Sequence, residues 1–321
     1  MSRKQKVLAL CGGVGGAKLA LGLKHILDDD ALSIVINTGD DFTHLGLRIC
    51  PDIDTVSYTL AGCVNPETGW GRADESGNFM AALSAMGGED WFFLGDKDLA
   101  LHVERTRLLA EGASLGDVTR GLSQKLGVSV PLIPMTNDKL ATQITCEFEG
   151  KARVLPFQDY FVRYRCEPKV QAIHFAGREE AKASAEFLAA LRDPDLALVV
   201  ICPSNPFLSI DPILALPRVR DALSELAIPV LAISPIIGGE AVKGPTAKIM
   251  AELGLAMTSA TVAKYYQDIV TGFIIDQRDE GEIDAIGQII PQVNVTKTLM
   301  KTKEDKINLA RDTLRFAGLC P

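Results

Sequence analysis

Short apolar runs alternate with stretches of helical periodicity at both ends of the chain. Residues 7–10 and 34–37 are apolar and bounded by turn residues, as is typical of buried parallel strands, and a helical pattern fills 19–27 between them. Strands that alternate with helices predict an α/β fold with a doubly wound, mostly parallel sheet. The alternation returns near residue 170, with strands expected at 196–202, 229–233, 270–275 and 291–295 and helices at 178–192, 211–226, 245–253, 259–267 and 303–317.

The middle of the chain follows a different pattern, in which helical periodicity dominates. The helical segments are 78–86, 100–111 and 114–126. Two runs that flank Glu149-Gly150-Lys151, at 143–148 and 152–157, predict a β-hairpin. We therefore expect a core formed by 1–65 and 168–321, and a mainly helical insertion with a small β-hairpin over 66–167.

Four glycines follow the first predicted strand, in the segment Cys-Gly-Gly-Val-Gly-Gly-Ala-Lys at 11–18. Glycine tolerates positive φ and lets backbone approach a ligand, and a helix N-terminus with Lys18 beside it favours an anion. The segment predicts either a cradle for a nucleotide phosphate or an ordinary strand-to-helix turn. It matches neither the G-x-G-x-x-G fingerprint nor a Walker loop.

Polar residues also follow other predicted strands, and the carboxyl ends of parallel strands meet at one edge of a sheet. The four strand-end segments are 11–18, 37–42, 203–206 and 234–239. Ser204 and Asn205 either hydrogen-bond a base or ribose, or act in their own turn, as Ser209 and Asp211 do more simply as helix caps.

An acidic cluster lies close in sequence to the glycine segment and comprises Asp40, Asp41, Asp52 and Asp54. Carboxylates beside a phosphate repel it unless a cation stands between them, and Mg²⁺ commonly bridges carboxylates and substrate phosphates. The cluster predicts a metal site, with Asp40 and Asp54 as the ligands. The alternative is that Asp52 or Asp54 only caps a helix.

Composition narrows the classes of function. The chain of 321 residues has a net charge of −8, which argues against sequence-independent binding of nucleic acid. Seven cysteines occur without a C-x-x-C pair, so we expect reduced thiols and a cytoplasmic protein, and no apolar run approaches the length of a membrane span.

Aromatic and basic residues in the insertion offer further candidates. Trp91, Phe92 and Phe93 precede the turn 95–98 and form either a surface for a flat ring or part of a core. Arg105 and Arg107 follow on a predicted helix and could bind phosphate bidentately, and His102 on that helix is more simply structural.

Seven motifs together resemble the 2-phospho-L-lactate transferases of coenzyme F420 biosynthesis, the CofD or FbiA family. They run in order from residue 7 to about residue 280, and P-D-I-D-T, P-S-N-P and S-P-I-I-G in combination are specific. The motifs are C-G-G-V-G-G-A-K at 11–18, N-T-G-D-D at 37–41, I-C-P-D-I-D-T-V at 49–56, L-G-D-K-D-L-A at 94–100, P-S-N-P at 203–206, S-P-I-I-G-G at 234–239 and A-K-Y-Y-Q-D at 263–268.

The resemblance implies a Mg²⁺-dependent transferase with a Rossmann-like core that forms a homodimer. Such an enzyme moves a phosphorylated three-carbon acid from a GDP-linked donor to the ribityl hydroxyl of the deazaflavin Fo and releases GMP. The acid stays open among 2-phospho-L-lactate, a phosphoenolpyruvate-derived group and 3-phosphoglycerate, because these differ by only a few pocket contacts.

The resemblance also implies roles for individual residues. Asp40 and Asp54 would hold Mg²⁺ and act in catalysis, with Asp54 orienting the acceptor hydroxyl or accepting its proton. Phe93 and Lys97 would border the deazaflavin. The residues expected to bind the nucleotide are Gly12, Gly13, Gly15, Lys18, Ser204, Asn205, Ser234 and Gly238.

Two other functions are compatible with parts of the sequence. The gluconeogenesis-factor proteins share a similar G-G-x-G segment and bind a nucleotide or nucleotide sugar in a regulatory role. The P-D-I-D-T and L-G-D-K-D segments favour the enzyme over this binding module. A nicotinamide oxidoreductase fits less well, because no acidic residue ends the strand at 34–37 to bind a ribose.

Overall fold

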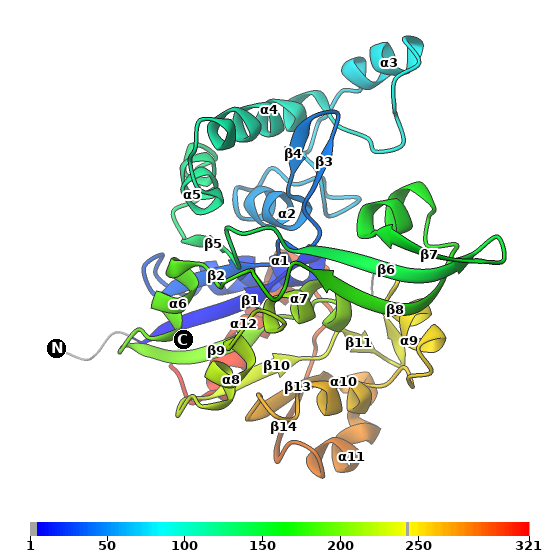
Figure 1. Cartoon of the computed structure of the whole chain (residues 1–321). Helices are drawn as coiled ribbons and strands as arrows, with labels where there is room; N and C mark the ends of the chain where they lie inside the picture. Colours follow the sequence, from blue (N-terminus) through cyan, green and yellow to red (C-terminus); the bar gives the residue numbers. More distant parts are fainter. Residues whose placement is uncertain (1–4, 242–243, 321) are drawn as a thin grey trace.

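The computed structural model describes residues 5–241 and 244–320, and a seven-stranded sheet runs through its centre (Figure 1). The strand order is β14-β13-β10-β9-β1-β2-β5, and all neighbouring strands are parallel. This confirms the predicted doubly wound, Rossmann-like α/β fold. The strands are β1 (Lys6–Cys11), β2 (Leu32–Ile36), β5 (Leu132–Pro134), β9 (Leu196–Ile201), β10 (Val230–Ile233), β13 (Gly272–Asp276) and β14 (Gln292–Thr296).

Successive residues of β1 pack into two different hydrophobic clusters, one on each face of the sheet. Leu8 and Leu10 belong to one cluster and Val7 and Ala9 to the other. Because both faces are covered, the strands read as continuous apolar runs. The second cluster contains α1 (Gly13–Lys24), α2 (Pro51–Leu60) and α12 (Lys303–Phe316); the first contains α6 (Ala185–Leu191), α7 (Asp211–Leu214), α8 (Val219–Ser224), α9 (Thr246–Glu252), α10 (Ser259–Tyr266) and α11 (Ile283–Gly287).

Three helices rise beyond one edge of the central sheet (Figure 1). They are α3 (Asn78–Ala85), α4 (Asp96–Ala110) and α5 (Leu115–Lys125), at the predicted positions except that α4 begins four residues earlier. A hairpin of β3 (Phe42–His44) and β4 (Leu47–Ile49) packs with them and was not predicted. Its turn places a leucine, Leu45, at a positive φ of 51°, which the residue type does not signal.

The predicted β-hairpin is present as β6 (Ala141–Phe148) and β7 (Lys151–Pro156), with Glu149 and Gly150 at positive φ in the turn. A third strand, β8 (Lys169–Ala176), pairs antiparallel with β6. The hairpin is therefore part of a three-stranded sheet, and this sheet crosses the predicted boundary at 168. The segment 66–167 also contributes to the core, because it contains β5, which pairs with β2 of the central sheet.

Two helices are shorter than their periodicity predicts. Instead of 178–192, helix α6 begins after Ser184, whose side chain accepts a hydrogen bond from the Phe187 amide as an N-cap. The helix expected over 211–226 is divided into α7 and α8, because Pro217 cannot continue a helix and Arg218 adopts a φ of 67°.

The remaining elements are short and lie at the ends of longer ones. They are β11 (Ile236–Ile237), β12 (Glu240–Ala241), two π-helical turns, η1 (Asp159–Arg163) and η2 (Pro206–Ile210), and the 3-10 turn η3 (Gln277–Glu282). Within the described residues, none of the helices combines the length and the apolar character that crossing a bilayer would need.

Candidate active site

One large cleft opens at the carboxyl ends of the parallel strands, with a volume of about 540 Å³. The strand order reverses between β1 and β9, and doubly wound folds bind their ligands at this point. Segments that follow β1, β2, β9 and β10 all line the cleft, so the predicted strand-end segments converge. Their lining residues include Gly12, Gly15, Asp40, Ser204, Asn205 and Ser234.

The glycine segment is pressed against its neighbours so closely that a side chain would not fit. Helix α1 begins at Gly13, whose φ is +62°. A Cβ on Gly15 would lie 2.1 Å from the Pro203 carbonyl oxygen. Gly15 is therefore needed for the close packing of this segment against the loop after β9.

Lys18 lies on the same wall and contacts the far end of the chain. Its ammonium group donates a hydrogen bond to the Met300 carbonyl at 3.1 Å, and both residues line the cleft. Lys18 therefore joins helix α1 to the segment that follows β14 at the wall of the cleft.

Asp52 fixes the glycine segment from the side of helix α2. Its carboxylate accepts a hydrogen bond from the Gly13 amide at 2.7 Å and one from the Asn37 side chain at 2.9 Å. Burial raises the pKa of Asp52 to about 6, although both hydrogen bonds act to lower it. Asp52 is thus an organiser of the cleft, and the N-cap of α2 is Cys50 instead.

Asp40 and Asp41 follow β2 and are buried. Asp40 Oδ1 has no hydrogen-bond partner in the described part of the chain, and burial together with the Asp52 charge raises the pKa of Asp40 well above its usual range. Asp41 forms an ion pair with Arg48, with 3.2 Å between Asp41 Oδ2 and Arg48 Nη2, yet burial raises the pKa of Asp41 to about 7. An unpartnered carboxylate oxygen beside like charge is a place that a cation would stabilise.

Lowering the pH from 8 to 6 should stabilise the folded protein through Asp41. The folded state binds this proton more tightly than the unfolded chain, because the pKa rises from 3.8 to about 7. Such a shift adds on the order of 1 kcal/mol at pH 6 that is almost lost at pH 8. Urea unfolding at both pH values should show a shallower pH dependence for Asp41→Asn, and an unchanged dependence would contradict the buried, protonated Asp41.

Asp54 also lies in the first turn of α2, and it forms a buried ion pair with Arg105 of helix α4. The two terminal nitrogens of Arg105 each donate to one carboxylate oxygen, with Nη1 at 3.1 Å from Oδ2. His102 Nδ1 lies 3.7 Å from the same oxygen. Asp54 is therefore neither a helix cap nor an isolated charge.

Ser204 and Asn205, in the loop after β9, satisfy much of their hydrogen bonding within the protein. The Ser204 hydroxyl accepts from the Gly12 amide and donates to the Gly12 carbonyl at 2.8 Å. The Asn205 side-chain oxygen Oδ1 accepts from the Phe207 and Leu208 amides, and its side-chain amide donates to the Thr246 hydroxyl at 2.9 Å. Both line the cleft, but their visible role is to hold its walls.

The other predicted binding residues divide between the cleft and its surroundings. Phe93 and Ser234 line the cleft, and the Ser234 hydroxyl is hydrogen-bonded to Ser259 at 2.8 Å. Gly238 and Lys97 are not among the lining residues. The Gly238 amide donates to Asp279, and the Lys97 ammonium donates to the Ala73 carbonyl at 3.4 Å.

Aromatic side chains form the part of the cleft that the insertion supplies. Trp91 and Phe92 pack edge to face with each other, and Arg163 lies 4.4 Å above the Trp91 ring. Phe157 and Phe161 stack with parallel rings and also line the cleft. This wall can accommodate a flat ring.

Several lining residues were missed from the sequence, although two signals could have found them. Residues 298–300 follow β14, so the rule that picked out the other strand ends also applies to them. Tyr58 lies one helical turn after Asp54 and shares its face. Gln158, whose amide lies 3.5 Å from the Asp40 carbonyl, follows no such pattern.

The fold and the cleft define a doubly wound α/β protein with its ligand site at the switch point of the sheet. The chain belongs to the 2-phospho-L-lactate transferase CofD family, whose family model matches residues 7–311. The resemblance that the motifs indicated is therefore confirmed, and the protein is a transferase.

Curated relatives match along almost the whole chain. A phosphoenolpyruvate transferase of Streptomyces griseus is 37% identical over 314 residues, which cover 97% of this chain and 98% of the relative. One of Mycobacterium tuberculosis is 37% identical over 302 residues, 88% of this chain and 91% of the relative. A crystal structure of a UPF0052 family member from Bacillus halodurans has a TM-score of 0.62 and covers 98% of this chain and 100% of its own, and at 14% identity it supports the fold alone.

Proposed function

We propose that the protein transfers a phosphorylated three-carbon acid from a GDP-linked donor to the terminal ribityl hydroxyl of Fo, in coenzyme F420 biosynthesis. The observation that carries the proposal is that Asp54 shares one cleft with a glycine segment and an aromatic wall. A glycine-rich helix N-terminus suits phosphates, and aromatic side chains suit a flat deazaflavin ring.

In the proposed reaction, the acceptor hydroxyl oxygen attacks the phosphorus atom that bears the acid. The bond between that phosphorus and the bridging oxygen breaks, GMP leaves with the electron pair, and Asp54 accepts the hydroxyl proton. Reactions of this type depend on positioning and on neutralising negative charge. The glycine segment and Lys18 supply donors for the phosphates, and Asp54 faces the acceptor.

The acidic residues of the cleft fit Mg²⁺. Asp40 offers a buried carboxylate oxygen, Oδ1, that has no hydrogen-bond partner among the described residues, and hard divalent ions prefer oxygen ligands. Asp54 remains the second proposed ligand, although both of its oxygens already contact Arg105, so Asp40 is the stronger one. When bound, the ion would neutralise the diphosphate. Asp54, Asp98 and His102 also bring ligand atoms within 4.8 Å of one another, but Arg105 already supplies positive charge there.

We further propose that the acid is phosphoenolpyruvate-derived, because the relatives at 36–37% identity are named phosphoenolpyruvate transferases. The test is to incubate the protein with Fo, Mg²⁺ and each GDP-linked donor in turn and to record the product mass. The enolpyruvyl product is lighter than the lactyl product by two hydrogen atoms. If none of the donors gives a product, the transferase proposal is contradicted. Unchanged Fo emission on mixing favours a nucleotide-binding regulator.

Replacing Gly15 by alanine should raise the KM for the donor about tenfold, whereas Gly22→Ala should lower stability and leave that KM unchanged. Each new Cβ would meet a backbone carbonyl at 2.1 Å, Pro203 for Gly15 and Lys306 for Gly22. Of these two glycines, Gly15 lines the cleft and Gly22 does not. A tenfold rise in KM corresponds to about 1.4 kcal/mol of binding free energy. Steady-state kinetics and thermal melting separate the two effects, and equal KM values for both variants would contradict a ligand role for the glycine segment.

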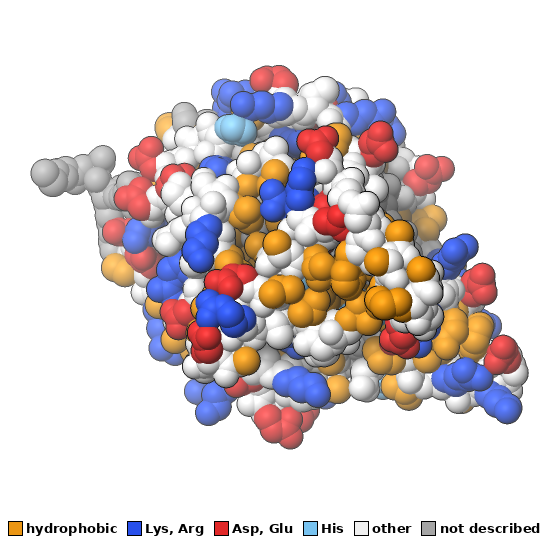
Figure 2. All heavy atoms as spheres, turned by 90° about the horizontal axis from the view of Figure 1, so that it is seen from above, with side chains coloured by type: hydrophobic (Ala, Val, Ile, Leu, Met, Phe, Trp, Pro, Cys, Tyr) orange, Lys and Arg blue, Asp and Glu red, His pale blue; other side chains and the backbone are white. Residues whose placement is uncertain are grey.

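We also propose that the protein is a cytoplasmic homodimer. All seven cysteines are free thiols in the structure, as a reducing compartment allows. Trp70, Met86 and Phe93 of the insertion are more than half exposed, and hydrophobic side chains gather on the face shown in Figure 2. Exposed apolar groups of this kind support a subunit contact or a substrate contact.

A further inference from the structure

Helix α4 places Arg105 beneath the cleft wall rather than inside the cleft. Arg105 is 2% exposed and has the largest of the fully buried side chains in the described part of the chain. It is not among the residues that line the cleft. Both terminal nitrogens of its guanidinium donate hydrogen bonds to Asp54, and Nη1 also lies 3.4 Å from the Arg48 carbonyl oxygen. Arg105 is therefore not available as the phosphate ligand that its sequence context allowed.

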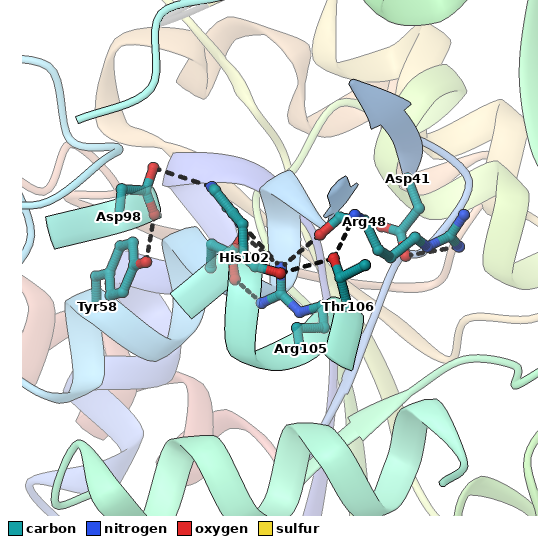
Figure 3. A network of polar contacts seen from close by, with 8 residues as sticks. Asp41, Arg48, Tyr58, Asp98, His102, Arg105 and Thr106 are labelled. Carbon is teal, nitrogen blue, oxygen red and sulfur yellow. Dashed lines mark hydrogen bonds and ion pairs between the residues drawn. The ribbon is translucent and has the colours of Figure 1, made fainter. Parts of the chain in front are cut away.

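His102 links Arg105 to Asp98 in the network of polar contacts (Figure 3), and both His102 and Asp98 line the cleft. Its Nδ1 lies 3.3 Å from Arg105 Nη1, and its Nε2 lies 3.3 Å from Asp98. The Tyr58 hydroxyl donates to the same Asp98 carboxylate. Nδ1 therefore faces the Arg105 guanidinium, whereas Nε2 approaches Asp98 without a hydrogen-bond partner among the described residues.

We propose that Arg105 and His102 are positioning residues that fix the Asp54 carboxylate in one orientation, and that Arg105 balances its charge at the cleft wall. The inference rests on the transferase function proposed above. A carboxylate has about four lone-pair sites, and the planar guanidinium fork takes two of them in a fixed geometry. The remaining sites of Asp54 are left for the acceptor hydroxyl or a cation in the cleft.

Stability alone does not account for this arrangement. Replacing a buried ion pair with packed apolar side chains is often neutral or stabilising, so a buried arginine is a poor way to hold two helices together. The pair joins α2 of the core to α4 of the helical insertion, 51 residues apart in sequence. The insertion thereby contributes to the chemistry of a carboxylate that belongs to the core.

Arg105→Lys tests the inference, because it keeps the charge and removes the fork. We expect kcat to fall about 100-fold, as small misplacements of a reacting group do, with the KM for the donor changed less than about threefold. Arg107→Lys is the matched control on the same helix. Arg107 is half exposed and pairs with Glu104 and Glu111, so its kcat should stay within about twofold of wild type.

Adding methylguanidinium to Arg105→Ala should restore kcat at least about tenfold relative to the same concentration of sodium chloride, because it refills the cavity with the missing fork. A residue that only supports the fold would show no such rescue. If Arg105→Lys has no cooperative melting transition, His102→Gln decides, with an expected loss of about tenfold in kcat at unchanged KM.

The outcomes separate the two proposals. A wild-type protein that is inactive with Fo and every GDP-linked donor overturns the proposed function and, with it, the positioning role. An active wild type with an equally active, folded Arg105→Lys overturns the positioning role alone. An active wild type with equal losses in Arg105→Lys and Arg107→Lys also overturns it.

Discussion

Replacing Asp54 by asparagine should lower kcat by about 10³-fold, because an amide neither accepts the acceptor proton nor carries the charge that the cleft requires. The protein should also lose about 3–5 kcal/mol of stability, because Arg105 remains buried without its partner. Steady-state kinetics and urea unfolding at pH 7 measure the two effects. Full activity of Asp54→Asn would refute the catalytic role.

The double variant Asp54→Asn/Arg105→Gln separates the loss of activity from the loss of stability. Two amides can hydrogen-bond to each other, so the unpaired buried charge disappears and much of the lost stability should return. Activity should not return, because the carboxylate is still missing. Recovery of turnover in the double variant would show that Asp54 acts only through the fold.

The stability part of this prediction differs from what the sequence implies. From sequence, Asp54 could be a helix cap, and asparagine is as good a cap as aspartate. In the structure α2 begins after Cys50, and Asp54 lies within its first turn, where it faces Arg105. The cost of the substitution therefore comes from a partner 51 residues away, and no local pattern reveals it.

The central sheet was predictable because its strands are buried on both faces and separated by periodic helices. The short strand β5 was not, since three residues, Leu132–Pro134, carry no periodicity. Its pairing with β2 is decided by tertiary packing, which is why the predicted insertion boundaries do not match the strand pairing. Pro217, by contrast, is a local signal for a helix break, and the prediction of one continuous helix over 211–226 did not take it into account.

The place of the cleft followed from the sequence, but the work of individual residues did not. Strand-end position alone brought Asp40, Ser204 and Ser234 to one site. Asn205 then turned out to bond the amides of its own turn, as turn residues often do, and Ser204 to bond the Gly12 backbone, 192 residues away in sequence. Arg105 and Arg107 look alike in sequence, and only the packing of α4 buries one and exposes the other.

Removing divalent cations should stop transfer, with a loss of at least about 100-fold that added Mg²⁺ reverses. Asp40, Asp52 and Asp54 all line the cleft, and Arg105 balances only Asp54. No lysine or arginine in the described residues forms an ion pair with Asp40 or Asp52, so a diphosphate would meet carboxyl groups there that no cationic side chain is paired with. The measurement is the initial rate after EDTA treatment, before and after Mg²⁺ is restored.

Binding of the ion itself can be followed without turnover. A cation that binds only the folded protein raises its melting temperature, so Mg²⁺ should stabilise the wild type and have little effect on Asp40→Asn. Asp41→Asn is the matched control: Asp41 is equally buried and its Oδ1 also has no hydrogen-bond partner among the described residues, but it does not line the cleft and it faces Arg48. An EDTA-treated protein that works at its original rate, or equal stabilisation of all three proteins by Mg²⁺, would contradict a cation held by Asp40.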